Sequence, residues 1–220
     1  MENGTLDLFD ASTDAQPLEQ VLAPGAVLLR GFALPVAPQL LHDLKPVIAQ
    51  APFRNLATPG GLTMSVSMTN CGSLGWVSDR SGYRYERYDP LSGRPWPAMP
   101  ESFSELARNA AERGGYTGFE PDACLVNRYQ PGALLSLHQD RDEADVAAPI
   151  VSVSLGLAAV FLFGGAKRGD QTQRVPLMHG DVVVWGGPTR LAFHGVLALK
   201  DGEHEVLGRQ RVNLTFRRAE

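Results

Sequence analysis

The chain has 220 residues, enough for one large domain with a sizeable buried core. Its composition, 44% hydrophobic and 20% charged, excludes a mainly disordered, collagenous or coiled-coil protein, and a net charge of −4 gives no sign of a strongly basic surface. No run approaches the roughly 18–20 apolar residues that a membrane helix needs. Acids, rather than Lys or Arg, occupy the N-terminus. We therefore expect a cytoplasmic protein with no membrane partner.

The first hundred or so residues predict a tail, a strand and two helices. Residues 1–20 carry five acids and no Lys or Arg, which is typical of a mobile acidic tail. A buried strand is expected over residues 26–32. Apolar residues then recur at helical spacing over residues 40–48, although Pro46 should kink or split that helix. A second helix is expected from residue 101 until Gly114 and Gly115 end it.

From residue 122 onward, short apolar or alternating runs are separated by Gly- and Pro-containing turns. They predict about eight strands, near residues 122–129, 133–140, 150–156, 159–163, 174–178, 181–185, 190–197 and 209–217. This pattern favours an α+β, mostly β fold with a double-stranded β-helix (jelly roll) core over about residues 122–217 and flanking N-terminal helices. No linker interrupts the chain, so we expect a single domain over residues 1–220.

One pair of residues has the spacing of metal ligands. His138 and Asp140 stand two apart in a predicted strand, so both side chains point to the same side. A second histidine from a distant strand would complete a 2-His-1-carboxylate triad, which suits non-haem Fe(II). His194 is the main candidate and His179 its rival, although His179 lies in a turn. A lone His-x-Asp pair is common by chance and is a weak signal by itself.

The last predicted strand, RVNLTFR, alternates polar and apolar residues. Arg211, Asn213, Thr215 and Arg217 share one face of this strand. If the face points into the barrel, the two arginines could grip the carboxylates of an anionic cosubstrate. If it points outward, it is an ordinary polar surface. Two further polar pairs share a strand face in the same way, Asn127 with Tyr129 and Ser152 with Ser154.

Aromatic residues and arginines alternate between residues 76 and 96. Five aromatics and four arginines stand there against three acids. Aromatic faces stack on bases and arginines meet phosphates, so the segment suits a single-stranded or flipped-out nucleotide. The alternative is a pair of hairpins with solvated arginines and ordinary cross-strand tyrosines.

Four motifs occur in a fixed order along the chain: NRYQPGALLSLHQD, HGDVVVWGG, RLAFHG and RVNLTFR. Their combination in this order identifies a family far more specifically than any single motif does. In these motifs the chain resembles the AlkB family of Fe(II)- and 2-oxoglutarate-dependent dioxygenases, which repair alkylated DNA. The resemblance covers nearly the whole chain and is weakest before Leu18 and across residues 197–210. It implies Fe(II) as cofactor, 2-oxoglutarate and O₂ as cosubstrates, and oxidative demethylation of 1-methyladenine and 3-methylcytosine.

The resemblance also implies roles for individual residues. Iron would be held by His138, Asp140 and His194. The cosubstrate 2-oxoglutarate would be held by Asn127, Tyr129, Arg211, Asn213 and Arg217. The damaged nucleotide would be contacted by Trp76, Tyr83, Arg84, Tyr85, Asp142 and Arg168, with a nucleotide-recognition lid over about residues 50–97. The expected partner is alkylated DNA, single- or double-stranded, with RNA as a further candidate, and the expected state is a monomer.

Two other functions compete with this one. A dioxygenase of the same chemistry could act on a protein, a lipid or a small metabolite, because the triad and the arginines specify the oxidant and not its target. A β-barrel binding module, holding zinc or no metal, would use the same residues without catalysis.

Overall fold

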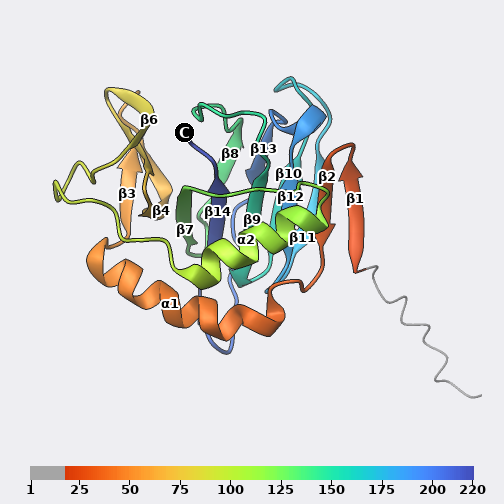
Figure 1. Cartoon of the computed structure of the whole chain (residues 1–220), viewed down its shortest axis with the longest axis horizontal. Helices are drawn as coiled ribbons and strands as arrows, with labels where there is room; N and C mark the ends of the chain where they lie inside the picture. Colours follow the sequence, from red (N-terminus) through yellow and green to blue (C-terminus); the bar gives the residue numbers. More distant parts are fainter. Residues whose placement is uncertain (1–17) are drawn as a thin grey trace, which may run out of the picture.

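Two antiparallel sheets pack face to face and form the centre of the fold in residues 18–220, the part of the chain that this computed structural model describes (Figure 1). The large sheet has the spatial order β1 (Glu19–Ala23), β2 (Ala26–Leu29), β12 (Val182–Trp185), β9 (Ile150–Gly156), β14 (Arg211–Arg217), β7 (Ala123–Tyr129), β4 (Thr63–Gly72) and β3 (Arg54–Ala57). The small sheet has the order β11 (Gln173–Leu177), β10 (Ala159–Phe163), β13 (His194–Val196) and β8 (Leu135–His138). A separate hairpin consists of β5 (Gly75–Asp79) and β6 (Gly82–Glu86). The predicted mostly β, jelly-roll fold is confirmed.

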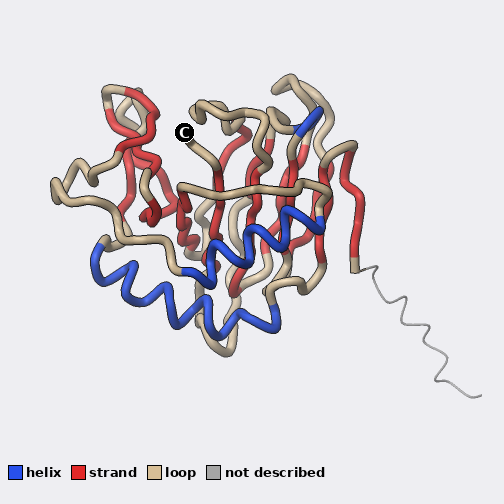
Figure 2. Tube along the Cα trace, in the orientation of Figure 1, coloured by secondary structure: helices blue, strands red, loops and turns tan. Residues whose placement is uncertain are grey.

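The two α-helices cover the outer face of the large sheet, so one face of that sheet meets helices and the other meets the small sheet (Figure 2). They are α1 (Ala37–Gln50) and α2 (Glu101–Arg113), and short 3-10 helices span Leu34–Val36 and Gly187–Thr189. Each α-helix buries residues at helical spacing: Ala37, Leu40, Leu44 and Val47 of α1, and Phe103, Leu106, Ala107, Ala110 and Ala111 of α2. Of the helices in the described part of the chain, none is long and apolar enough to cross a membrane.

The expected break at Pro46 does not occur, because α1 continues through that residue to Gln50. Pro46 lies on the exposed face of the helix, where the carbonyl group that loses its N–H partner faces water. Leu44 and Val47, on either side of it, are buried in the core. Burial of the inner face therefore outweighs the missing hydrogen bond.

Strand β14 separates its side chains between the two faces as the alternation predicts. Val212, Leu214 and Phe216 pack in the core beneath the helices. Arg211, Asn213, Thr215 and Arg217 point to the opposite side, and all four are buried. The polar face therefore points into the fold, and the outward alternative is wrong. The neighbouring strands β7 and β9 pair with β14 in register, so Asn213 lies between Asn127 and Ser154.

Several elements differ from the prediction. The expected strand over residues 26–32 ends at Leu29. The strand expected over residues 190–197 is shorter and consists of β13 (His194–Val196), with a 3-10 helix before it. Strands β1, β3 and β4 were not predicted, whereas the β5–β6 hairpin agrees with the hairpins of the alternative interpretation of residues 76–96. The segment expected to form the lid, about residues 50–97, includes β3 and β4, which belong to the large sheet, together with the β5–β6 hairpin. The expected tail lies outside the described residues up to residue 17, and Glu19 and Gln20 begin β1.

The core beneath the helices predicts a large loss of stability for Phe103→Ala. Phe103 is fully buried and meets Phe216 edge-on with ring centroids 6.1 Å apart. Removing the ring leaves a cavity, so we expect the free energy of unfolding in urea to fall by about 3–5 kcal/mol. Leu91→Ala, at a residue that is 80% exposed, is the control and should change it by less than about 0.5 kcal/mol. Equal effects of the two substitutions would contradict this packing.

Candidate active site

A cavity of about 590 Å³ opens between the two sheets. The polar face of β14 forms its floor, and residues of β7, β8, β12 and β13 line its sides. Trp76 and Tyr83 of the β5–β6 hairpin stand at one side of the same cavity. Residues from both halves of the sequence therefore meet in a single polar pocket within the jelly roll.

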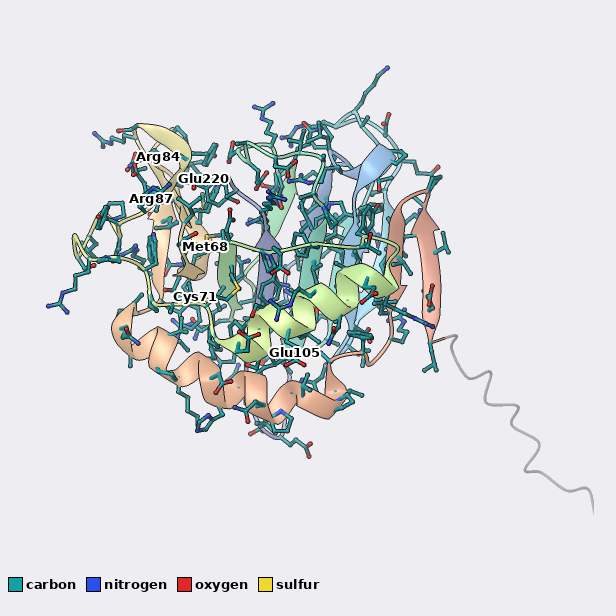
Figure 3. The ribbon with its side chains drawn as sticks, viewed as in Figure 1. Met68, Cys71, Arg84, Arg87, Glu105 and Glu220 are labelled. Atoms are coloured by element: carbon teal, nitrogen blue, oxygen red, sulfur yellow. The ribbon has the colours of Figure 1, made fainter. Side chains whose placement is uncertain are left out.

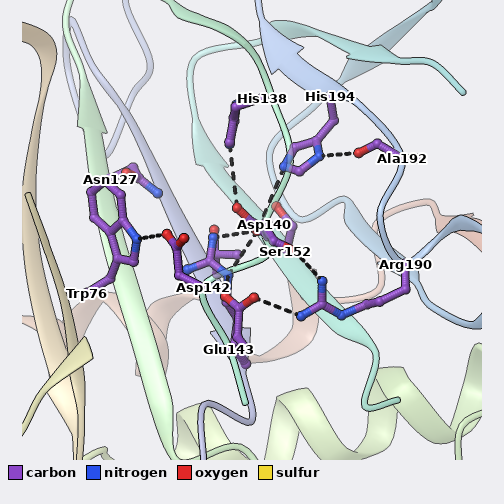
Figure 4. Close-up of polar contacts among 12 residues, drawn as sticks. Trp76, Asn127, His138, Asp140, Asp142, Glu143, Ser152, Arg190, Ala192 and His194 are labelled. Atoms are coloured by element: carbon purple, nitrogen blue, oxygen red, sulfur yellow. Dashed lines mark hydrogen bonds and ion pairs between the residues drawn. The ribbon is translucent and has the colours of Figure 1, made fainter. Parts of the chain in front are cut away.

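His138, Asp140 and His194 come together in this cavity (Figure 4). One ligand atom from each residue lies within 4.8 Å of the others. His138 ends β8 and His194 begins β13, and the two residues are directly paired in the small sheet. Nε2 of His138 is 3.6 Å from Oδ1 of Asp140, and Nε2 of His194 is 3.8 Å from Oδ2. Two nitrogens and one oxygen on one side of a pocket form the donor set that suits non-haem Fe(II).

The backbone orients both histidine rings for metal binding. Nδ1 of His138 lies 2.9 Å from the carbonyl oxygen of Ser136, and Nδ1 of His194 lies 2.9 Å from that of Ala192. A carbonyl oxygen only accepts, so each Nδ1 must donate a proton to it. The proton on Nδ1 leaves the Nε2 lone pair free and directed at Asp140.

The charge states also suit a cation site. Burial, reinforced by the neighbouring His138, lowers the pKa of His194 to about 4, so this imidazole is neutral at pH 7. Burial opposes ionisation of the Asp140 carboxyl, but the Arg217 guanidinium and the two histidines outweigh it and hold the pKa of Asp140 well below its usual range. The triad therefore presents the neutral imidazole of His194 and the Asp140 carboxylate at neutral pH.

The two arginines of β14 have different environments. Arg217 donates from Nε and Nη2 to Oδ2 of Asp140, at 2.9 Å and 2.6 Å. Arg211 is only 1% exposed and forms no ion pair with any residue among 18–220. It donates from Nη2 to Ser154, and its guanidinium lies over the ring of Tyr129. Its Nε and Nη1 have no partner, and burial lowers its pKa.

The pocket around Arg211 fits a carboxylate-bearing cosubstrate. A buried cation with two unused donors needs an anion, and a carboxylate can take both donors at once. Among the described residues, the other buried side-chain atoms without a partner are Nε1 of Trp185 and Oδ1 of Asn127, and the latter is an acceptor that cannot bind a carboxylate. The amide of Asn213 is fully used by the chain, since it donates to Ser152 and Val153 and accepts from Asn127 and Thr215. Asn213 therefore orients Asn127 and holds the floor of the pocket.

Four of the six expected nucleotide contacts line the cavity: Trp76, Tyr83, Asp142 and Arg168. Trp76 and Tyr83 are stacked, with ring centroids 5.5 Å apart, and the indole N–H of Trp76 donates to Oδ2 of Asp142 at 2.9 Å (Figure 4). Arg168 donates to the backbone carbonyl of Leu137 and lies over the ring of Phe193.

Arg84 and Tyr85 do not line the cavity in this structure. Arg84 is paired with Asp79 and Glu86 within its own hairpin, at 2.9 Å and 2.7 Å. Figure 3 shows Arg84 on the hairpin and Arg87 just after it, where an ion pair joins Arg87 to the C-terminal residue Glu220. The hydroxyl of Tyr85 donates to Glu143 at 2.6 Å. The roles of Arg84 and Tyr85 in nucleotide binding stay predictions.

His179 does not join the triad. Its ring packs against His204, with centroids 4.6 Å apart, and its Nδ1 accepts the backbone N–H of Gly156. Two residues that were not predicted as part of the site, Arg190 and Glu143, are buried beside Asp140. Glu143 follows Asp140 by three residues, in a segment with no regular structure, so no periodicity marked it.

Comparison with known proteins agrees with this geometry. A family model described as the 2OG-Fe(II) oxygenase superfamily matches residues 25–217. Over 214 residues the chain is 59% identical to the alpha-ketoglutarate-dependent dioxygenase AlkB of Salmonella typhimurium, covering 97% of this chain and 98% of that protein. It is 58% identical to AlkB of Escherichia coli with the same coverage. The chain belongs to the AlkB family.

The solved structure of OsALKBH1 also matches, with a TM-score of 0.79 and 30% identity over 91% of this chain and 99% of that one. Membership of the AlkB family makes the chain an alpha-ketoglutarate-dependent dioxygenase that uses Fe(II), 2-oxoglutarate and O₂. The predicted family, enzyme class and cofactors are confirmed. The triad supplies the donor atoms that Fe(II) needs, and the unpartnered N–H groups of Arg211 suit a carboxylate of 2-oxoglutarate.

The metal site predicts that Asp140→Ala abolishes iron binding. The substitution removes the only charged ligand and leaves Arg217 without its carboxylate partner in the triad. Loss of a residue that only supports a metal ligand lowers metal affinity by roughly 10–100-fold. Loss of the ligand itself should cost at least as much, so we expect little iron to remain bound after desalting. Asp201→Ala, which breaks only an exposed ion pair with Arg209, should bind iron normally. Full iron occupancy in a folded Asp140→Ala protein would refute the assignment.

The cosubstrate pocket predicts that Arg211→Met makes the ligand-free fold more stable but abolishes binding of 2-oxoglutarate. The unpaired buried cation should destabilise the ligand-free fold, so its removal should raise the free energy of unfolding by about 1–3 kcal/mol. Wild-type protein with Mn²⁺ should gain thermal stability when 2-oxoglutarate is added, and the variant should not. Arg209→Met, at an exposed neighbour, should keep that gain. A 2-oxoglutarate response in Arg211→Met would contradict the proposed role.

Proposed function

We propose that this dioxygenase demethylates N-alkylated bases, with 1-methyladenine and 3-methylcytosine in DNA as its main substrates and RNA as a further one. The products are the repaired base, formaldehyde, succinate and CO₂. The observation that carries the proposal is the position of Asp142, whose carboxylate lines the cavity beside the triad and is held by the indole of Trp76.

A carboxylate at this position favours the damaged base over the normal one. 1-Methyladenine and 3-methylcytosine carry a positive charge, and undamaged adenine and cytosine do not. Oδ2 of Asp142 accepts from Trp76, and Oδ1 is left for the base. A negative charge in a partly enclosed pocket stabilises the cationic base selectively, which gives discrimination that shape alone does not provide.

The aromatic residues suit a base that has left its stack. Trp76 rests on Tyr83, which leaves the other face of the indole available to a base. The imidazole of His138 lines the same cavity, so a planar base would lie between two rings with its N-methyl group toward the triad. Arg168, at the cavity wall, supplies a cation for the phosphate backbone.

When bound, Fe(II) and 2-oxoglutarate activate O₂, so that one oxygen atom enters the methyl C–H bond and the other enters succinate as CO₂ leaves. Arg211, Tyr129 and Asn127 hold and orient the cosubstrate, and Arg217 maintains the charge of Asp140. The hydroxymethyl group on the base nitrogen then loses its hydroxyl proton, the C–N bond breaks, and formaldehyde leaves as the nitrogen keeps the electron pair. The neutral base binds Asp142 less strongly, which favours release.

We further propose that the enzyme acts as a monomer, because the metal ligands, the cosubstrate contacts and the stacking residues all come from one chain. A DNA substrate would place it in the compartment of the chromosome, which in bacteria is the cytoplasm. The β5–β6 hairpin and its neighbouring loops would form the nucleotide-recognition lid.

Mass spectrometry of a single-stranded oligonucleotide with one 3-methylcytosine tests the proposal. Incubation with the enzyme, Fe(II), ascorbate, 2-oxoglutarate and air should remove one methyl group, and omission of iron or 2-oxoglutarate should prevent it. Consumption of 2-oxoglutarate with no change in the oligonucleotide would indicate another substrate. No consumption at all would favour a binding module without catalysis.

The stacking role predicts a selective defect in Trp76→Ala. Loss of one base-stacking face should weaken binding of the methylated oligonucleotide by about 1–3 kcal/mol, or roughly 5–150-fold in Kd. Decarboxylation of 2-oxoglutarate without DNA should be unchanged. Trp76→Phe keeps an aromatic face but lacks the N–H that holds Asp142, so it should recover part of the affinity. Equal loss of both activities in Trp76→Ala would contradict the stacking role.

A further inference from the structure

Glu143 is a buried carboxylate with no role in the mechanism described so far. It is 7% exposed and has three partners that are distant in the sequence. Nη2 of Arg190 lies 3.1 Å from its Oε2, and Nε of Arg217 lies 3.3 Å from its Oε1. The hydroxyl of Tyr85 donates to the same Oε1 at 2.6 Å. A carboxylate this far from water is kept only where its partners compensate its charge.

Both arginines that hold Glu143 also hold the iron ligand Asp140. Arg217 binds the Asp140 carboxylate through Nε and Nη2, and Nη1 of Arg190 donates to the Asp140 backbone carbonyl at 2.7 Å. Two cations and two carboxylates thus form one buried cluster, visible in part in Figure 4. Loss of the Glu143 charge would leave the cluster with an uncompensated positive charge beside the metal ligand.

Glu143 also connects this cluster to the β5–β6 hairpin. Tyr85 and Trp76 are directly opposite each other in that hairpin. Trp76 donates to Asp142, and Tyr85 donates to the next residue, Glu143. Two neighbouring loop residues therefore hold one cross-strand pair, which gives the hairpin two attachment points close together.

The two attachments differ when a base is bound. Asp142 lines the cavity, so a bound cationic base reaches its free Oδ1, beside the Oδ2 that Trp76 holds. Tyr85 and Glu143 do not line the cavity, and their hydrogen bond is out of the reach of substrate. Burial raises the pKa of Tyr85, so its hydroxyl keeps the proton that it donates. Of these two attachments, the Tyr85–Glu143 bond is therefore the one that substrate does not touch, and Asn70 separately holds the backbone of Trp76.

We propose that Glu143 is a positioning residue that joins nucleotide recognition to the metal centre: it keeps Arg217 on Asp140 and, through the Tyr85 hydroxyl, holds the hairpin so that Trp76 stays over the triad. Tyr85 thereby acts through Glu143 and not by touching the base. The substrate part of this inference rests on the proposed demethylase function.

Tyr85→Phe tests the attachment, because it removes one hydroxyl and leaves the charged cluster complete. Hydrogen bonds to charged groups are among the stronger ones, so we expect KM for the 3-methylcytosine oligonucleotide to rise roughly ten-fold. We expect kcat and KM for 2-oxoglutarate to change less than about two-fold, since the cluster that holds Asp140 is intact. Amide hydrogen exchange of the ligand-free protein should become faster over residues 75–86.

Tyr116→Phe is the matched control. Its hydroxyl also donates to a single oxygen, the carbonyl of Gly25 at 2.7 Å, and neither residue lines the cavity. This variant should leave KM for the oligonucleotide and hydrogen exchange over residues 75–86 unchanged. The comparison separates loss of a specific attachment from loss of any tyrosine hydrogen bond.

Glu143→Gln tests the link to the metal. The amide oxygen can still accept from Tyr85, but the negative charge between the arginines is lost. We expect Fe(II) affinity to fall roughly ten-fold and the visible charge-transfer band of the anaerobic Fe(II)–2-oxoglutarate protein to shift. Tyr85→Phe should change neither. The two variants therefore report the two halves of the proposal separately.

The outcomes also distinguish this inference from the proposed function. If wild-type protein demethylates the oligonucleotide and Tyr85→Phe matches Tyr116→Phe in KM and in hydrogen exchange, the attachment role is refuted. If Glu143→Gln keeps normal iron affinity and an unshifted band, the link to the metal is refuted. If wild-type protein does not demethylate the oligonucleotide, the proposed function fails, while hydrogen exchange and iron binding still decide the structural roles of Tyr85 and Glu143.

Discussion

The burial of two arginines on one face of β14 is the constraint around which the active site is organised. A guanidinium inside a protein must find carboxylates and hydrogen-bond acceptors, because the loss of hydration is otherwise too unfavourable. Arg217 finds them in Asp140 and Glu143. The opposite face of the same strand is apolar and packs beneath the helices. One strand therefore holds the helical layer on one side and the charged floor of the cavity on the other.

The second arginine, Arg211, has two N–H groups without a hydrogen-bond partner among the described residues. Arg211 has a tyrosine ring beneath it and a serine hydroxyl as acceptor, but no carboxylate among the described residues pairs with it. The difference between the two arginines separates two tasks. Arg217 maintains the charge of a metal ligand, and Arg211 provides positive charge for a ligand that is not part of the chain. A buried site of this kind reduces stability in the ligand-free state and gains it back on binding.

The short segment from Asp140 to Glu143 connects these elements to substrate recognition. Its first residue belongs to the triad, Asp142 meets the indole of Trp76, and Glu143 meets the hydroxyl of Tyr85. The hairpin is separate from both sheets, so its orientation depends on such side-chain contacts more than on backbone pairing. Those contacts therefore set the position of the recognition element relative to the metal ligands.

The sequence by itself determined the architecture of the second half of the chain, because strands show a spacing of two, and its four ordered motifs indicated the chemistry through their resemblance to the AlkB family. That periodicity placed the two arginines of β14 on one face and predicted the strands of the jelly roll. It also paired His138 with Asp140, although the predicted strand over residues 133–140 is only β8, which ends at His138, so Asp140 follows it in a loop. Only the tertiary structure decided what depends on contacts between distant residues. It selected His194 over His179, showed that α1 continues through Pro46 because the exposed face tolerates the lost hydrogen bond, and distinguished Arg211 from Arg217 by their partners. The partnership of Tyr85 with Glu143 joins residues 58 positions apart in irregular surroundings, and no local pattern encodes such a contact.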